Sequence, residues 1–159
     1  MSNPLDIADA VIAELNGIDW PIDWPPGLAF TAERSHAPKF DVGQLADLVV
    51  VVCARSQKRT RSTRLKRRVS TIVEVGVMQK LPPAADVEAQ AERIEELARL
   101  TQYLAEYFGD HPRPTSRPAA CILDEVERDP LIDAKLLRNA NQFACVIRLP
   151  IEESEGGAT

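Results

Sequence analysis

The sequence has little of the chemistry that metal centres and disulfide frameworks need. It contains three cysteines and two histidines in 159 residues. Cys53, Cys121 and Cys145 fall in apolar, strand-like runs, where a thiol behaves as a small hydrophobe, and their odd number and spacing match neither a zinc site nor a set of disulfides. His36 and His111 each lie in a proline-containing loop with no metal-ligand spacing around them. We therefore expect no metal and no cofactor.

Glycine-rich loops and long apolar runs are also missing. The seven glycines are scattered, so no strand leads into a helix through a phosphate-binding loop. No apolar run approaches the roughly 20 residues that cross a bilayer, and the N-terminus lacks the basic and hydrophobic regions of a secretion signal. Burial of a carboxylate such as Glu74, on a predicted strand, would suggest acid–base chemistry, and the alternative is that Glu74 faces solvent. We expect a protein that folds in the cytoplasm, has no membrane partner and is not an enzyme.

The pattern of the remaining residues predicts one α+β domain over residues 1–151. Its mainly antiparallel sheet would be covered by one long helix and an N-terminal helix. Expected helices span 3–16 and 86–108, with Gly109 as the cap of the second, and a short helix or ordered loop spans 131–139. A turn of helix is also expected over 41–46. Expected strands span 28–34, 48–53, 69–79, 119–127 and 143–149, so the main order is α-β-β-β-α-β-β. The acidic, glycine-containing end, 152–159, is expected to be a disordered tail.

Both tryptophans lie in a short tandem repeat, Ile-Asp-Trp-Pro, at residues 18–25. Proline prevents a helix or a central strand here. The loop could fold Trp20 and Trp24 over its own core. Alternatively, these two residues could dock on a neighbouring subunit, because tryptophan is enriched at interface hot spots.

The strongest functional signal is a run of positive charge at residues 55–68, predicted to be the loop of a hairpin between two strands. The run contains no acidic residue, although the whole chain carries a net charge of −5. It could be a solvated hairpin tip or a contact for a polyanion or an acidic subunit surface. Its basic residues are Arg55, Lys58, Arg59, Arg61, Arg64, Lys66, Arg67 and Arg68.

Several segments resemble the tail-terminator and neck proteins of tailed bacteriophages, which sit at the head-tail junction. The resemblance is carried by an opening helix at 6–11, the strand Phe-Thr-Ala-Glu-Arg at 30–34 followed by a turn at 38–41, the strand at 73–81 leading into a long helix, and a closing strand from 142 to 149. The Trp-Pro repeat and the proline-rich link at 112–118 look like additions to that pattern. No catalytic residue belongs to it.

The resemblance implies a virion structural protein, assembled in the host cytoplasm, that forms a ring of six copies. The ring would terminate the tail tube and join it to the connector or stopper protein, with genomic double-stranded DNA passing through it without sequence-specific contacts. A head-closure stopper or a connector adaptor is the alternative within this class. An alternative of another class is a small, non-specific nucleic-acid-binding domain.

Overall fold

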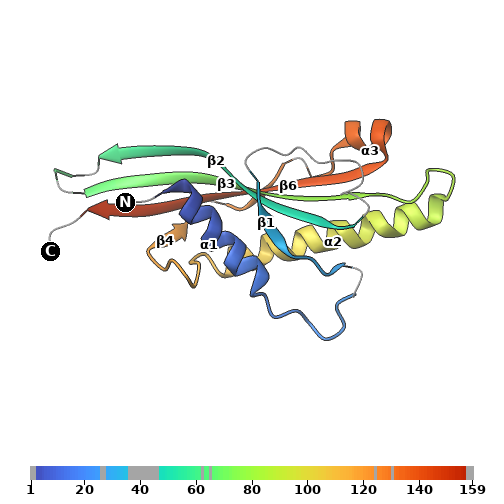
Figure 1. The fold of residues 1–159 in the computed structure, drawn as a ribbon, viewed down its shortest axis with the longest axis horizontal. Coiled ribbons are helices and arrows are strands. Elements are labelled where there is room, and N and C mark those ends of the chain that lie inside the picture. Colours follow the sequence, from blue (N-terminus) through green and yellow to red (C-terminus); the bar gives the residue numbers. More distant parts are fainter. Residues whose placement is uncertain are drawn as a thin grey trace.

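The computed structural model describes residues 3–25, 28–35, 47–61, 63–64, 66–123, 125–129 and 131–156. Within these residues, three helices pack on a six-stranded sheet (Figure 1). The elements are α1 (Pro4–Asn16), β1 (Ala32–Arg34), β2 (Val49–Arg61), β3 (Lys66–Lys80), α2 (Val87–Asp110), β4 (Ala120–Ile122), β5 (Glu127–Arg128), α3 (Ala134–Ala140) and β6 (Gln142–Gly156). The sheet order is β1-β2-β3-β6-β4, and β5 also pairs with β6. Only the β1–β2 pair is parallel among these strands, so the expected α+β class with a mainly antiparallel sheet is confirmed.

The N-terminal helix has the limits that its sequence predicts. The side chain of Asn3 accepts a hydrogen bond from the Leu5 amide at 2.9 Å, and Pro4 occupies the first turn. At the other end, the Gly17 amide donates to the Ala13 carbonyl at 3.0 Å. The face between them buries Ile7, Ala8, Ala10, Val11 and Leu15.

The long helix α2 covers only part of the sheet. It begins at a capping aspartate, Asp86, and continues through Gly109, so the expected glycine cap is wrong and His111 occupies that position. Its buried residues begin at Leu97 and end at Phe108. At 1.5 Å per residue the helix is about 36 Å long, whereas the 15-residue strand β3 reaches about 50 Å. Because the helix is the shorter element, it leaves part of the strand uncovered.

One side of the sheet, called here the helix face, carries the hydrophobic core. Alternate residues of β3, including Val73, Val75 and Val77, point to this face and are fully buried against α1 and α2. The intervening residues, including Glu74 and Gly76, point to the opposite face, where α3 lies near one end of the sheet (Figure 1). Figure 1 shows α1 and α2 together on the helix face.

The basic segment is not a loop, which corrects the prediction. Strand β2 continues to Arg61 and β3 begins at Lys66, so seven of the eight basic residues lie in strands. Strand β6 likewise runs to Gly156, so residues 152–156 are not a disordered tail, and 157–159 lie outside the described residues. Backbone pairing with β3 along its full length keeps both polar segments extended. Apolar alternation, the usual strand signal, is missing from them.

These extended strand ends form a three-stranded projection, called the arm from here on. It consists of residues 54–61 of β2, 66–72 of β3 and 150–156 of β6. In Figure 1 the arm runs to the left end of the molecule, beyond both long helices. A β-bulge between Ala54 and Ser56 marks its start on β2.

The remaining segments differ in detail from the expected order. The strand expected over 28–34 is limited to β1, and the one over 119–127 is split into the short strands β4 and β5. The short helix or loop over 131–139 is α3, capped by Asp133. The turn of helix expected over 41–46 falls outside the described residues.

Candidate interaction surface

The arm concentrates its positive charge on its edge strand β2 and its middle strand β3. Arg55, Lys58, Arg59 and Arg61 lie on β2, Lys66, Arg67 and Arg68 lie on β3, and Arg64 lies in the turn between them. The register places Arg61 directly opposite Arg67. Like charges in directly opposed positions of an antiparallel pair destabilise it. The tip therefore carries an unfavourable electrostatic term that a negative partner would relieve.

Part of this charge is already neutralised within the chain. The Arg55 Nε atom lies 3.6 Å from Glu74 Oε1, and the Arg68 Nε atom lies 2.7 Å from Glu152 Oε1. Lys58, Arg61, Arg64 and Arg67 are exposed and form no ion pair within the described part of the chain. These four residues, called the unpaired cations below, lie near the tip. They are the groups best placed to meet a negative partner.

Along the arm, no strand of the described residues pairs with the outer edge of β2. Strand β1 pairs only with Val50, Val51 and Val52, and beyond Val52 the only strand paired with β2 in the described residues is β3. An edge strand presents backbone donors and acceptors that another chain can pair with. Charged side chains and bulges on such an edge limit indiscriminate pairing, and this edge has both.

The third strand of the arm is acidic, which the sequence prediction missed. Glu152 and Glu153 lie on β6 opposite Ser70 and Val69, and Glu155 stands opposite Arg67. Glu153 is held by Arg117 of the proline-rich link, with Nε–Oε2 and Nη2–Oε1 distances of 2.6 and 2.8 Å. The arm thus has a basic edge on β2 and an acidic strand on its other side. No sequence signal pairs the acidic end with the basic run, because their contact depends on sheet order.

The two predicted interface aromatics pack on their own chain. The rings of Trp20 and Trp24 stack with centroids 5.1 Å apart, and both lie about 5 Å from the ring of Tyr103 on α2. Phe30 meets Trp20 edge-on at 5.6 Å. Both indoles are half-buried against the core. This arrangement agrees with a loop folded over its own core, and a contact of these residues with a neighbouring subunit stays a prediction.

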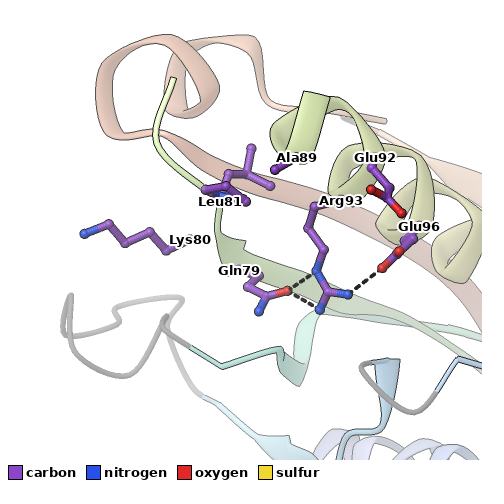
Figure 2. A pocket seen from close by; sticks show the side chains of 8 residues that line it. Gln79, Lys80, Leu81, Ala89, Glu92, Arg93 and Glu96 are labelled. Carbon is purple, nitrogen blue, oxygen red and sulfur yellow. Dashed lines mark hydrogen bonds and ion pairs between the residues drawn. The ribbon is translucent and has the colours of Figure 1, made fainter. Parts of the chain in front are cut away.

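A surface hollow of about 500 Å³ lies at the other end of the molecule, between the start of α2 and the end of β3. Figure 2 shows Arg93 reaching across it. The guanidinium donates to Gln79 Oε1 at 2.9 and 2.5 Å and to Glu96 Oε2 at 2.8 Å (Figure 2). These hydrogen bonds satisfy the guanidinium of Arg93 and connect α2 to β3. The hollow is therefore a structural contact between α2 and the sheet.

Glu74, the one carboxylate that the sequence singled out, has arginine partners on the opposite face of the sheet. Its Oε1 atom lies 3.6 Å from Arg55 and 3.9 Å from Arg148, beside a cavity of about 240 Å³. The cavity lining is mostly apolar, with Val51, Met78 and Val146 among its residues. Glu74 therefore acts as the acid of an ion-pair cluster in this structure.

Other groups with catalytic or metal-binding potential are dispersed. His111 stacks on Tyr107 with ring centroids 4.3 Å apart, and His36 lies outside the described residues. Burial raises the pKa of the Cys145 thiol, although a hydrogen bond with Thr101 and the charge of Arg128 act in the other direction. In the part of the chain that the structure describes, no cluster of histidine, cysteine and acidic residues could hold a metal ion. Over the same residues, no helix combines the length and apolarity that a membrane crossing requires.

No protein-family model matches the chain, and no curated protein matches it significantly.

Proposed function

We propose that the chain is a ring-forming structural protein of a bacteriophage head-tail junction, in which the arm meets negative charge. The observation that carries the proposal is the set of unpaired cations, Lys58, Arg61, Arg64 and Arg67, on a projecting three-stranded arm. The α+β class and the long helix on one face of the sheet fit the subunit that the sequence resemblance implies. Six copies around the tail end would terminate the tube and join it to the connector or stopper.

The distribution of charge supports a head-to-tail assembly. A heterologous interface uses two different surfaces of each subunit and closes into a ring when its rotation permits. This chain carries a basic strand and an acidic strand in the same arm. Two copies that met through the same basic strand would repel each other. Unlike surfaces are therefore the favoured contact.

A ring would also place many cations around a duplex. With six copies, one or two phosphate contacts from each would give about 6 to 12 contacts, and 6 to 10 already produce strong salt dependence. The basic segment of the arm has no aromatic residue on which a nucleic-acid base could stack, so its contacts with DNA would be electrostatic. Non-specific contact is what a channel for genomic DNA requires.

The test replaces the four unpaired cations by serine in one variant. The matched control replaces four exposed basic residues outside the arm, Arg99, Arg113, Lys135 and Arg138, and so makes the same change in net charge. Native mass spectrometry would measure assembly of each protein alone and with tail tubes from the phage that encodes it. We expect the arm variant to lose ring formation or infectivity while circular dichroism stays unchanged, and the control to keep both.

Two outcomes would contradict the proposal. A wild-type chain that stays monomeric with and without tail tubes, yet binds a 30-bp duplex with steep salt dependence, would indicate a separate nucleic-acid-binding domain. Full infectivity of the arm variant would show that the unpaired cations of the arm are not needed for the function. Rings that bind the connector but not the tail tube would favour a stopper or an adaptor.

A further inference from the structure

We propose that the outer edge of β2 in the arm binds an extended acidic segment of another protein, which adds to the sheet as a further strand. The segment would lie beside residues 56–61 and carry two carboxylates three residues apart. This inference rests on the proposed function for its premise that the arm meets a negative partner, and it names the chemistry of that partner.

The edge of β2 is the more open of the two edges of the arm. From Ser56 to Arg61, β2 pairs with β3 on one side and with no strand of the described residues on the other. On the far side of the arm, β4 already covers β6 at Ile151, Glu152 and Glu153. An uncovered edge presents backbone N–H and C=O groups, and a strand laid along it satisfies both kinds. The β2 edge is therefore the side of the arm that can accept a strand.

The cations of this edge lie on both faces of the sheet, because directly opposed residues of paired strands share a face. Lys58 stands opposite Ser70, which lies on the same face of β3 as Glu74. Arg61 stands opposite Arg67, which lies on the helix face. A partner as thin as a strand, lying in the plane of the sheet, can present a negative group to each of them.

The separation of the two cations sets the spacing of the carboxylates. Lys58 and Arg61 are three residues apart, which is about 10 Å along a strand. Acidic residues three apart in an added strand match them whichever way that strand runs, and they also project to opposite faces. A carboxylate beside Arg61 would in addition relieve the repulsion between Arg61 and Arg67.

Two other occupants fit this edge less well. The phosphate oxygens of a duplex accept hydrogen bonds but cannot donate to the carbonyls of the edge. A second β2 edge would bring Lys58 and Arg61 beside like charges, which destabilise paired strands. The bulge beside Arg55 and the charged side chains also limit pairing with an apolar strand. Backbone and charge together favour an acidic strand from another protein.

A synthetic peptide tests the contact on the whole chain. The peptide has the sequence Thr-Val-Glu-Thr-Val-Glu-Thr-Val-Thr and is blocked at both ends. Fluorescence anisotropy, with a neutral dye on the peptide, would measure its affinity, and hydrogen exchange followed by mass spectrometry would locate it. We expect binding to slow amide exchange in residues 56–61 and to leave β4, at the far edge of the sheet, unchanged.

A matched peptide separates strand addition from attraction between charges. Thr-Val-Glu-Pro-Pro-Glu-Thr-Val-Thr keeps both glutamates at the same spacing and stays extended, but its adjacent prolines remove one backbone donor from each edge of the peptide. We expect it to bind about tenfold more weakly. Equal affinities of the two peptides would overturn the inference, because charge alone would then account for binding.

Variants of the chain identify the two charge contacts. Lys58→Ser and Arg61→Ser should each weaken binding about fivefold, whereas Arg99→Ser, at an exposed position on α2, should leave it unchanged. Arg61→Glu should bind one of the two peptides in which a single glutamate is replaced by lysine. The peptide that restores binding reports the direction of the added strand, and restoration by neither would overturn the pairing.

The outcomes separate this contact from the proposed function. If rings form with tail tubes, as judged by native mass spectrometry, but the acidic peptide does not protect residues 56–61, the inference is overturned and the proposed function stands. If a 30-bp duplex protects these residues and the peptide does not, the edge binds nucleic acid and the inference is again overturned. A chain that stays monomeric with tail tubes but binds the peptide at this edge would keep the strand contact and overturn the ring.

Discussion

Arg117 and Glu153 form a two-pronged ion pair that fastens the proline-rich link to the arm. The Glu153 side chain is only 8% exposed, and both of its oxygens accept hydrogen bonds from the guanidinium. Glu153 stands opposite Ala120 on β4, so the pair lies where the link becomes a strand. The link that looked like an addition in the sequence is therefore a support for the arm.

Removing Arg117 should destabilise the protein strongly. Arg117→Ala leaves the Glu153 carboxylate buried without this cation, and breaking a buried pair on one side costs about 3 kcal/mol. Urea denaturation would measure the change in the free energy of unfolding. The double variant Arg117→Ala with Glu153→Gln should be more stable than Arg117→Ala alone, because no buried charge remains.

Arg113 provides the control for this pair in the same link. It is exposed and donates only to the Pro118 carbonyl, at 3.0 Å, in the described contacts. Arg113→Ala should change stability by less than about 0.5 kcal/mol. Equal effects of the two alanine variants would show that Arg117 contributes no more than an ordinary surface residue.

The stacked tryptophans should contribute to stability through Tyr103. Trp20→Ala removes its contacts with Trp24, Phe30 and Tyr103, and we expect a loss of about 2 to 3 kcal/mol because the indole is only half-buried. Thermal unfolding followed by circular dichroism would measure it. Ile22→Ala, at a fully exposed position of the same loop, should have almost no effect.

The same loop allows a test of the predicted subunit contact. Trp24→Phe keeps an aromatic ring at the stack and should leave assembly unchanged if the indoles serve only their own core. Impaired ring formation by a variant of normal stability would instead assign Trp24 to an interface.

Asn141 joins the end of α3 to the turn after β3. It has φ 52° and ψ 45°, the left-handed region, and its side-chain amide donates to the carbonyls of Leu81 and Pro82 at 3.1 and 2.8 Å. Its side-chain oxygen also contacts the amide of Gln90 on α2. Asparagine suits this position because it tolerates left-handed backbone and bridges two segments.

Two substitutions at Asn141 separate these roles. Asn141→Gly keeps the backbone conformation and loses the hydrogen bonds, at an expected cost of about 1 to 2 kcal/mol. Asn141→Ala loses the bonds and adds strain of about 1 kcal/mol or more. Chemical denaturation should therefore rank wild type, glycine and alanine in order of decreasing stability. An alanine variant as stable as the glycine variant would contradict the role of backbone strain, and Asn139→Ala, on exposed α3, is the neutral control.

Elements with a one-sided apolar pattern could be predicted from the sequence. Helix α1 follows from a capping asparagine, a proline and a regular apolar stripe, and its limits agree with the structure. The start of α2 follows equally from Asp86. In both, the information that determines the element lies within the segment itself.

The arm could not be predicted in the same way. Residues 54–61 and 152–156 have no apolar alternation, so charge and glycine suggested a loop and a tail. They are strands because each pairs with β3, and that pairing is decided by residues far apart in the sequence. The sequence alone shows where the cations lie along the chain, whereas their division between β2 and β3, and the acidic strand beside them, required the fold.

The bulge at the start of the arm absorbs one residue of β2 without moving the later side chains of the strand. Ala54 stands opposite Val73 and Ser56 opposite Ile72, so Arg55 has no partner of its own on β3. A chain shortened by Arg55 would lose one charge and the bulge, whereas Ser56 and every later residue of β2 would keep its place opposite β3. The bulge therefore adds one cation at the base of the arm, where the Arg55 Nε atom lies 3.6 Å from Glu74 Oε1, and leaves the orientation of the basic strand unchanged.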